Sequence, residues 1–157
     1  MKLNLGSLDR YMEGFISVDI CEPADVVCDL RGPWFPDSDS SVDEVFAADV
    51  FEHLPDKIHT MNELWRVLKP NGIAKIQVPH ASEGDGGHCD PTHKSYWTTS
   101  DFEYFCTGFA ERERFRGKGE YARINAEFAV VSMTKTRHAR RWGGFVVEIN
   151  AILRAIK

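Results

Sequence analysis

Residues 45–80 constrain the fold of this chain most, because they read as strand, loop, helix, turn and strand in that order. The residues from Val42 to Ala48 are mostly apolar, which is typical of a strand covered on both faces. Apolar side chains at three- and four-residue steps then predict a helix with one apolar face, which Pro55 opens and Pro70-Asn71-Gly72 ends. The segment from Ile73 to Val78 completes a right-handed βαβ unit with parallel strands.

Five further segments are predicted to be strands. They are residues 2–6, 15–20, 24–30, 126–134 and 145–156. The connections among the first three are short, so the helices that normally cover parallel strands are expected to be trimmed or absent there. The last two indicate a terminal antiparallel hairpin, and we interpret the basic segment KTRHARR between them, residues 135–141, as a solvated loop.

Composition limits the class of protein. A chain of 157 residues, 43% of them hydrophobic, is expected to form one domain over residues 1–157. No apolar run approaches the roughly 20 residues of a membrane span, and we expect no secretory signal before the first strand, because apolar residues begin at Leu3. The four cysteines lack a C-x-x-C spacing and are expected to be reduced thiols of a cytoplasmic protein. A net charge of -5 argues against a nucleic-acid partner.

The ends of the early strands carry residue types that suit a nucleoside. Gly6 ends the first strand, Asp19 the second and Asp29 the third. A glycine lets a ligand approach the backbone, and a carboxylate after the second strand accepts hydrogen bonds from ribose hydroxyls. Asp29 and the neighbouring Leu30 suit an adenine amino group and ring face. Each of these signals is weak alone, and together they predict an adenosine-binding edge of the sheet.

On these residues the chain resembles the class I S-adenosylmethionine-dependent methyltransferases, in particular the type 11 group related to the ubiquinone/menaquinone methyltransferases. The segments that carry the resemblance are LNLG (3–6), VDI (18–20), ADVVCDL (24–30), FPDSDSSVDEVFAADVFEHLPD (35–56), ELWRVLKPNGIAKIQVPH (63–80) and DPTHKSYWT (90–98). The resemblance implies an α/β, Rossmann-like, mostly parallel sheet of about seven strands with an antiparallel last strand. It also implies S-adenosylmethionine as the cofactor.

Residues that match the family motif are expected to contact the cofactor. The resemblance assigns Gly6 to the cofactor loop, Asp19 to the ribose, and Asp29 with Leu30 to the adenine. Ile20, next to Asp19, is also expected to contact the cofactor. Ala48 matches the position beside the methionine moiety. The family has a second glycine two residues after the first, whereas this chain has Leu8 there.

Transfer of a methyl group from a sulfonium is an in-line displacement that depends on positioning and requires no metal. A base helps only if the acceptor must lose a proton. His80, which directly follows the predicted fifth strand, is the first candidate to face an acceptor, and His93 and Tyr96 in the following loop are further candidates. Glu52 and His53, by contrast, are interpreted as structural. We expect a small-molecule acceptor.

Two other functions remain open from the sequence. A protein that kept the cofactor-binding fold but lost turnover is one, because the loop after Gly6 departs from the family pattern. A transition-metal site is the other, since His80, His88, Cys89, Asp90 and His93 are suitable ligand types, although their spacing matches no structural zinc pattern. The reduced helical cover is also compatible with a homo-oligomer.

Overall fold

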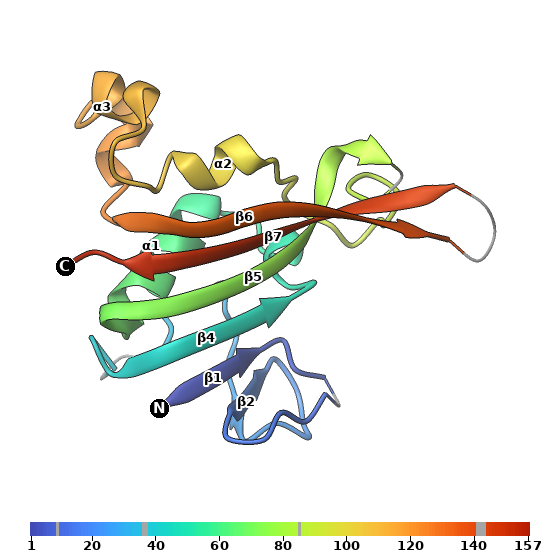
Figure 1. The fold of residues 1–157 in the computed structure, drawn as a ribbon. Coiled ribbons are helices and arrows are strands. Elements are labelled where there is room, and N and C mark those ends of the chain that lie inside the picture. Colours follow the sequence, from blue (N-terminus) through green and yellow to red (C-terminus); the bar gives the residue numbers. More distant parts are fainter. Residues whose placement is uncertain (9, 36–37, 85, 141–143) are drawn as a thin grey trace.

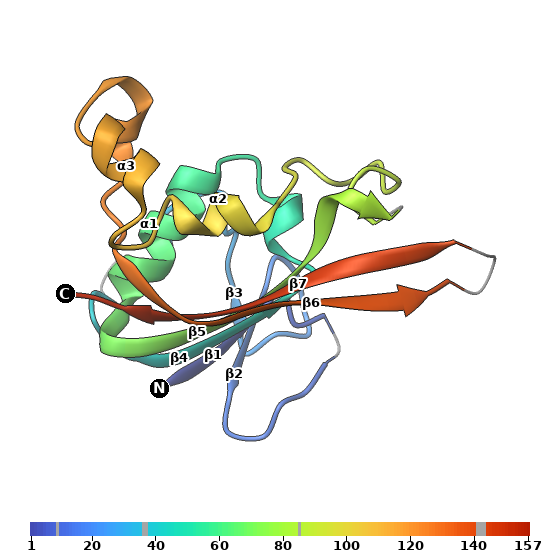
Figure 2. The ribbon, with the colours of Figure 1, turned by 45° about the horizontal axis from the view of Figure 1, so that its top comes forward.

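A seven-stranded sheet forms the centre of the molecule, with the strands in the order β3-β2-β1-β4-β5-β7-β6 (Figure 1; β3 is labelled in Figure 2). The structure, a computed structural model, describes residues 1–8, 10–35, 38–84, 86–140 and 144–157. The strands are β1 (Lys2–Leu5), β2 (Ile16–Asp19), β3 (Val26–Val27), β4 (Val42–Ala48), β5 (Leu68–Gly84), β6 (Phe128–Ala139) and β7 (Phe145–Ala155). Strands β1 to β5 pair in parallel, and β7 runs antiparallel to both β5 and β6. The predicted Rossmann-like sheet is therefore confirmed.

The helices of the structure are short and lie on one side of the sheet (Figure 2). They are α1 (Lys57–Val67), α2 (Thr99–Glu103) and α3 (Ala110–Phe115), with 3-10 turns η1 (Phe51–His53) and η2 (Gly119–Arg123). Helix α1 buries Met61, Leu64 and Val67, and these residues belong to the same core as the alternating apolar residues of β4 and β5. Among the described residues, no helix is both long and apolar enough to cross a membrane.

The opposite face of the sheet has no helical cover from any residue that the structure describes. No helix connects β1 to β2, β2 to β3 or β3 to β4 within the described ranges, which confirms the expected reduction at the N-terminal side. On this face Glu44 is half-buried between two lysines, because its carboxylate pairs with Lys2 at 2.8 Å and with Lys75 at 2.6 Å on neighbouring strands. Charged cross-strand pairs replace the apolar contacts that a covering helix would make.

Helix α1 begins two residues later than predicted. Pro55 does not open the helix, because Asp56 is the N-cap and its side chain accepts a hydrogen bond from the His59 amide at 3.0 Å. At the other end the helix passes directly into β5. The predicted turn at Pro70-Asn71-Gly72 lies within β5, where the pairing with β4 shifts register and Asn71 has a φ of 64°.

Strand β5 continues well past the predicted end at Val78. It runs to Gly84, which pairs with Val146 of β7, so the first four residues of the predicted loop 81–97 belong to the sheet. The prediction that His80 lies just beyond the strand was therefore wrong. The pairing partner of this extension is about 60 residues away in the sequence, and the local polar pattern does not reveal it.

Strands β3 and β6 also differ from their predicted lengths. Strand β3 has only two residues, so Asp29 and Leu30 lie in the turn that follows it. Strand β6 extends to Ala139 and pairs with β7 over its whole length. The basic segment is thus largely a strand rather than a solvated loop, and its residue 141 lies outside the described residues.

Candidate cofactor pocket

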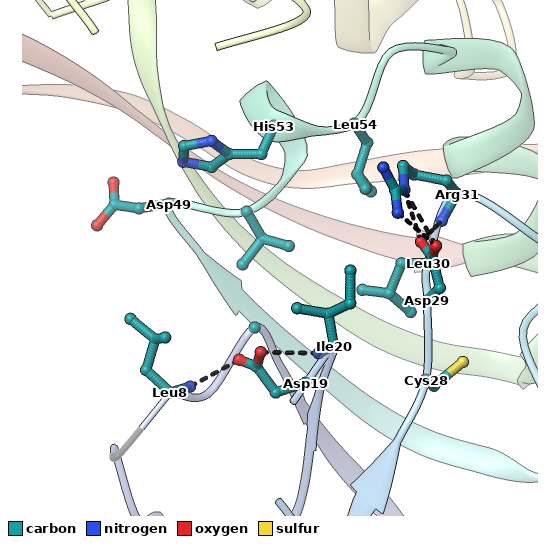
Figure 3. A pocket seen from close by; sticks show the side chains of 12 residues that line it. Leu8, Asp19, Ile20, Cys28, Asp29, Leu30, Arg31, Asp49, His53 and Leu54 are labelled. Atoms are coloured by element: carbon teal, nitrogen blue, oxygen red, sulfur yellow. Dashed lines mark hydrogen bonds and ion pairs between the residues drawn. The ribbon is translucent and has the colours of Figure 1, made fainter. Parts of the chain in front are cut away.

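A pocket of about 340 Å³ opens at the carboxyl ends of β1, β2 and β4 (Figure 3). Its size is near the lower end of the roughly 300–1,000 Å³ range typical of small-molecule sites. It is lined by Gly6, Leu8, Asp19, Ile20, Cys28, Asp29, Leu30, Arg31, Asp49, Val50, His53 and Leu54. The structure thus brings together five of the six residues predicted to contact a cofactor, and it does so at the edge of the sheet where parallel strands present ligand sites.

The loop after β1 requires the glycine at its first position. Gly6 has a φ of 59°, and a Cβ on it would lie 2.3 Å from a methyl carbon of Val50, so any side chain would be both strained and crowded. Two residues on, Leu8 has a φ of 46°, a conformation that glycine adopts far more readily. The loop therefore keeps a glycine-like backbone at the position where the family pattern has its second glycine.

Asp19 ties this loop to the end of β2. Its carboxylate is almost completely buried, and its two oxygens accept hydrogen bonds from the amides of Leu8 at 2.8 Å and Ile20 at 2.7 Å (Figure 3). Oδ1 also accepts a hydrogen bond from the Cys21 thiol at 3.7 Å, whereas Oδ2 has a second lone pair that remains available to a ligand. The Ile20 side chain is 57% exposed beside it and offers the pocket an apolar surface.

The turn after β3 forms one wall of the pocket, and Leu30 lies on this wall. Asp29 is held by Arg31, whose guanidinium donates from Nε at 2.9 Å and from Nη2 at 2.7 Å, and this lowers the pKa of Asp29 to about 2. Trp34 then packs fully buried beneath the turn and donates from its indole to the Leu30 carbonyl at 2.8 Å. Trp34 is therefore a core residue that positions the turn.

The end of β4 supplies the opposite wall. Asp49 has a φ of 55° and directs the chain away from the sheet into η1, which places Val50, His53 and Leu54 on the pocket. Ala48, which the resemblance assigned to the cofactor, is buried in the strand and does not line the pocket.

The three residues predicted to face an acceptor lie in different places in the structure. His80 is buried inside β5, where its Nδ1 accepts a hydrogen bond from the Ser82 amide at 3.2 Å. Tyr96 stacks on His88 with ring centroids 4.1 Å apart, and neither residue lines the pocket. His93 alone of the three predicted residues lies next to a pocket residue, because its ring meets the edge of His53 with centroids 5.0 Å apart.

Glu52 lies beside these two histidines and is 2% exposed. Its backbone carbonyl accepts hydrogen bonds from the amides of Lys94 at 2.7 Å and Ser95 at 2.9 Å, which brings the loop containing His93 against η1. Burial, reinforced by the charges of Asp49, Asp90 and Glu148, raises the pKa of the Glu52 carboxyl to about 8. The sequence interpretation gave Glu52 and His53 a structural role and missed this grouping.

Several pocket residues were not predicted from the sequence. Val50 and Leu54 follow the predicted end of β4 closely, and this proximity was the only available signal for them. Arg31 was missed because its role depends on the turn that follows a strand of only two residues.

This strand order, one antiparallel strand and a pocket at the early strand ends define the class I methyltransferase fold. A family model described as a methyltransferase domain matches residues 7–76, a little under half of the chain. The match confirms the predicted resemblance to the type 11 group, and it agrees with the expected enzyme class and cofactor. The search of curated proteins found no match.

Solved structures share the fold over nearly the whole chain at low identity. An S-adenosylmethionine-dependent methyltransferase from Methanosarcina mazei is 12% identical, with a TM-score of 0.63, over 99% of this chain and 92% of its own. The 1,6-didemethyltoxoflavin-N1-methyltransferase of Burkholderia thailandensis, solved with S-adenosylhomocysteine, is 16% identical, with a TM-score of 0.62, over 99% and 71%. A methyltransferase in complex with the Haloferax volcanii Trm112 activator is 16% identical, with a TM-score of 0.56, over 99% and 82%.

Proposed function

We propose that this protein is an S-adenosylmethionine-dependent methyltransferase that acts on a small-molecule acceptor. The observation that carries the proposal is the pocket itself, which joins Gly6, Asp19 and Leu30 from three separate strand ends. The carboxylate of Asp19 suits the ribose hydroxyls, and Ile20 with Leu30 suits the faces of the adenine. The 1,6-didemethyltoxoflavin methyltransferase, solved with bound 1,6-didemethyltoxoflavin and S-adenosylhomocysteine, supports the same class of reaction.

Catalysis in this proposal rests on positioning. In-line alignment of acceptor, methyl carbon and sulfur can supply up to about 7–11 kcal/mol of the barrier reduction. The end of β4, where Asp49 and His53 face the pocket, is the place where the methyl end of a cofactor gripped by Asp19 and Leu30 would lie. A cytoplasmic location and a homo-oligomer remain predictions, and light scattering on the purified chain tests the second of them.

Titration calorimetry with S-adenosylmethionine and S-adenosylhomocysteine tests the pocket. We expect Asp19→Asn to lower the affinity at least tenfold, and Ile20→Ala to lower it severalfold without affecting folding, because the Ile20 side chain is exposed. Glu120→Gln is the matched control, since it removes one carboxylate charge from η2, remote from the pocket lining. Full affinity in both pocket variants would refute the proposed site.

Formation of S-adenosylhomocysteine with a panel of hydroxyl, thiol and amine acceptors then tests turnover. A protein that binds the cofactor tightly and transfers no methyl group to any acceptor class would favour the alternative function, a cofactor-binding protein without catalysis. Glycine-like geometry at Leu8 supports cofactor binding, which both functions require, so the turnover assay decides between them.

A further inference from the structure

Three metal-ligating side chains converge beside the pocket, at the end of β4. Glu52, His53 and His93 each offer one ligand atom, and the three atoms all lie within 4.8 Å of one another. Two of these residues come from η1, and the third is brought to them by the backbone hydrogen bonds that Lys94 and Ser95 donate to the Glu52 carbonyl. The grouping is therefore built into the fold and does not depend on a mobile surface side chain.

Glu52 is the first sign that the grouping serves a ligand. Its side chain is 98% buried, since only 2% is exposed, and Oε2 has no hydrogen-bond partner in the described part of the chain. No salt bridge to Glu52 is formed among those residues, and the nearby charges that act on it, from Asp49, Asp90 and Glu148, are negative. A buried carboxyl oxygen without a hydrogen-bond donor or a cation is costly, so the position of Oε2 suits a positive partner.

His93 is the second sign, because its ring is already oriented as metal-bound imidazoles usually are. Its Nδ1 donates to the Gly87 carbonyl at 2.8 Å, which places the proton on that nitrogen, and Nε2, 3.9 Å from an Asp90 carboxylate oxygen, is then the nitrogen that can bind an ion. A carbonyl that fixes the far nitrogen of a ligating histidine is the usual support around a metal ion. His53 is held in a similar way by Thr92, whose hydroxyl lies 3.2 Å from its Nδ1.

We propose that Glu52, His53 and His93 bind a divalent transition-metal ion beside the cofactor pocket. Two imidazole nitrogens and one carboxylate oxygen form the ligand set of many catalytic zinc sites and of other transition-metal sites. Ligand atoms at about 2.0–2.2 Å from a tetrahedral ion lie roughly 3.4 Å apart. Separations within 4.8 Å therefore close with small side-chain rotations.

Three protein ligands leave at least one coordination position open, and His53 belongs both to this grouping and to the pocket lining. That position suits an ionisable oxygen of the acceptor, a role that rests on the proposed methyltransferase function. The acceptor hydroxyl would release its proton to solvent when its oxygen binds the ion. The oxygen lone pair would then form the new bond to the methyl carbon, and the sulfonium sulfur would keep the electron pair of the broken bond.

Calorimetry with Zn²⁺ on chelator-treated full-length protein tests the site without any methyl acceptor. We expect one ion per chain, and we expect Glu52→Gln and His93→Ala each to lower the affinity at least tenfold. His88→Ala is the matched control, because it removes an exposed imidazole from the same loop as His93 and should leave the affinity within twofold. Circular dichroism shows whether each variant is folded, and His93→Ala keeps the test valid if Glu52→Gln does not fold.

The Co²⁺-substituted protein gives an independent readout. We expect visible d–d absorption without a thiolate charge-transfer band, and loss of that absorption in His93→Ala. Absence of a bound ion, or affinities in both ligand variants equal to wild type, would overturn the proposal. A thiolate band, or lost binding in His88→Ala, would overturn it in favour of a site that contains Cys89 or His88. S-adenosylhomocysteine affinity in the chelated protein is measured separately, so failure of the metal site is distinguishable from failure of the proposed methyltransferase.

Discussion

Replacing Gly6 by alanine is the most informative perturbation of the cofactor loop. A residue with a side chain at a φ of 59° costs about 1–2 kcal/mol. The new Cβ would also lie 2.3 Å from Cγ2 of Val50 and 3.1 Å from its Cγ1, and overpacking of this kind costs about 1–3 kcal/mol. We therefore expect Gly6→Ala to lower the free energy of unfolding by about 2–5 kcal/mol and to weaken binding of S-adenosylhomocysteine.

A double-mutant cycle separates the two contributions. Val50→Ala removes both crowding methyl groups, so the double variant should be more stable than the sum of the single effects predicts, by about 1–3 kcal/mol. Urea unfolding of the four proteins measures this coupling, and the m-values show whether the unfolded state has changed. Effects that add to within about 0.5 kcal/mol, or a neutral Gly6→Ala, would refute the packing argument.

Three further predictions follow from particular residues. Leu8→Gly should relieve a strained φ of 46° and make the loop more stable by up to about 1 kcal/mol, measured by thermal unfolding, and Leu8→Ala should not reproduce this gain. Glu52 has a pKa raised by burial from 4.5 to about 8, so the native state binds more protons than the unfolded state between these two pKa values, and the metal-free protein should lose up to about 4 kcal/mol of stability as the pH rises from 5 to 8. Melting curves in chelator should show this slope in the wild type and not in Glu52→Gln. Arg112 is buried and donates to the Ala126 carbonyl at 3.0 Å, so Arg112→Ala should cost about 3 kcal/mol in chemical unfolding, and an equal cost for the exposed Arg114→Ala would contradict this reasoning.

The sequence determined the framework and one edge of the sheet. The short apolar run of β4 and the three- and four-residue steps of α1 are local patterns, so both elements could be predicted without a structure. The sequence also predicted that Gly6, Asp19 and Leu30 lie close together, and all three line the pocket. The reason is that neighbouring parallel strands end at the same edge of the sheet.

Only the tertiary structure decided which side chains beyond that edge meet. Because β5 extends to Gly84, which pairs with Val146, His80 lies inside the strand and not on the pocket. His93 lies beside Glu52 because the amides of Lys94 and Ser95 donate hydrogen bonds to the Glu52 carbonyl. Arg112, in a stretch of charged residues, is buried and donates to the Ala126 carbonyl. These contacts join residues that are distant in the chain, and they depend on packing and desolvation, which no local pattern of residue types records.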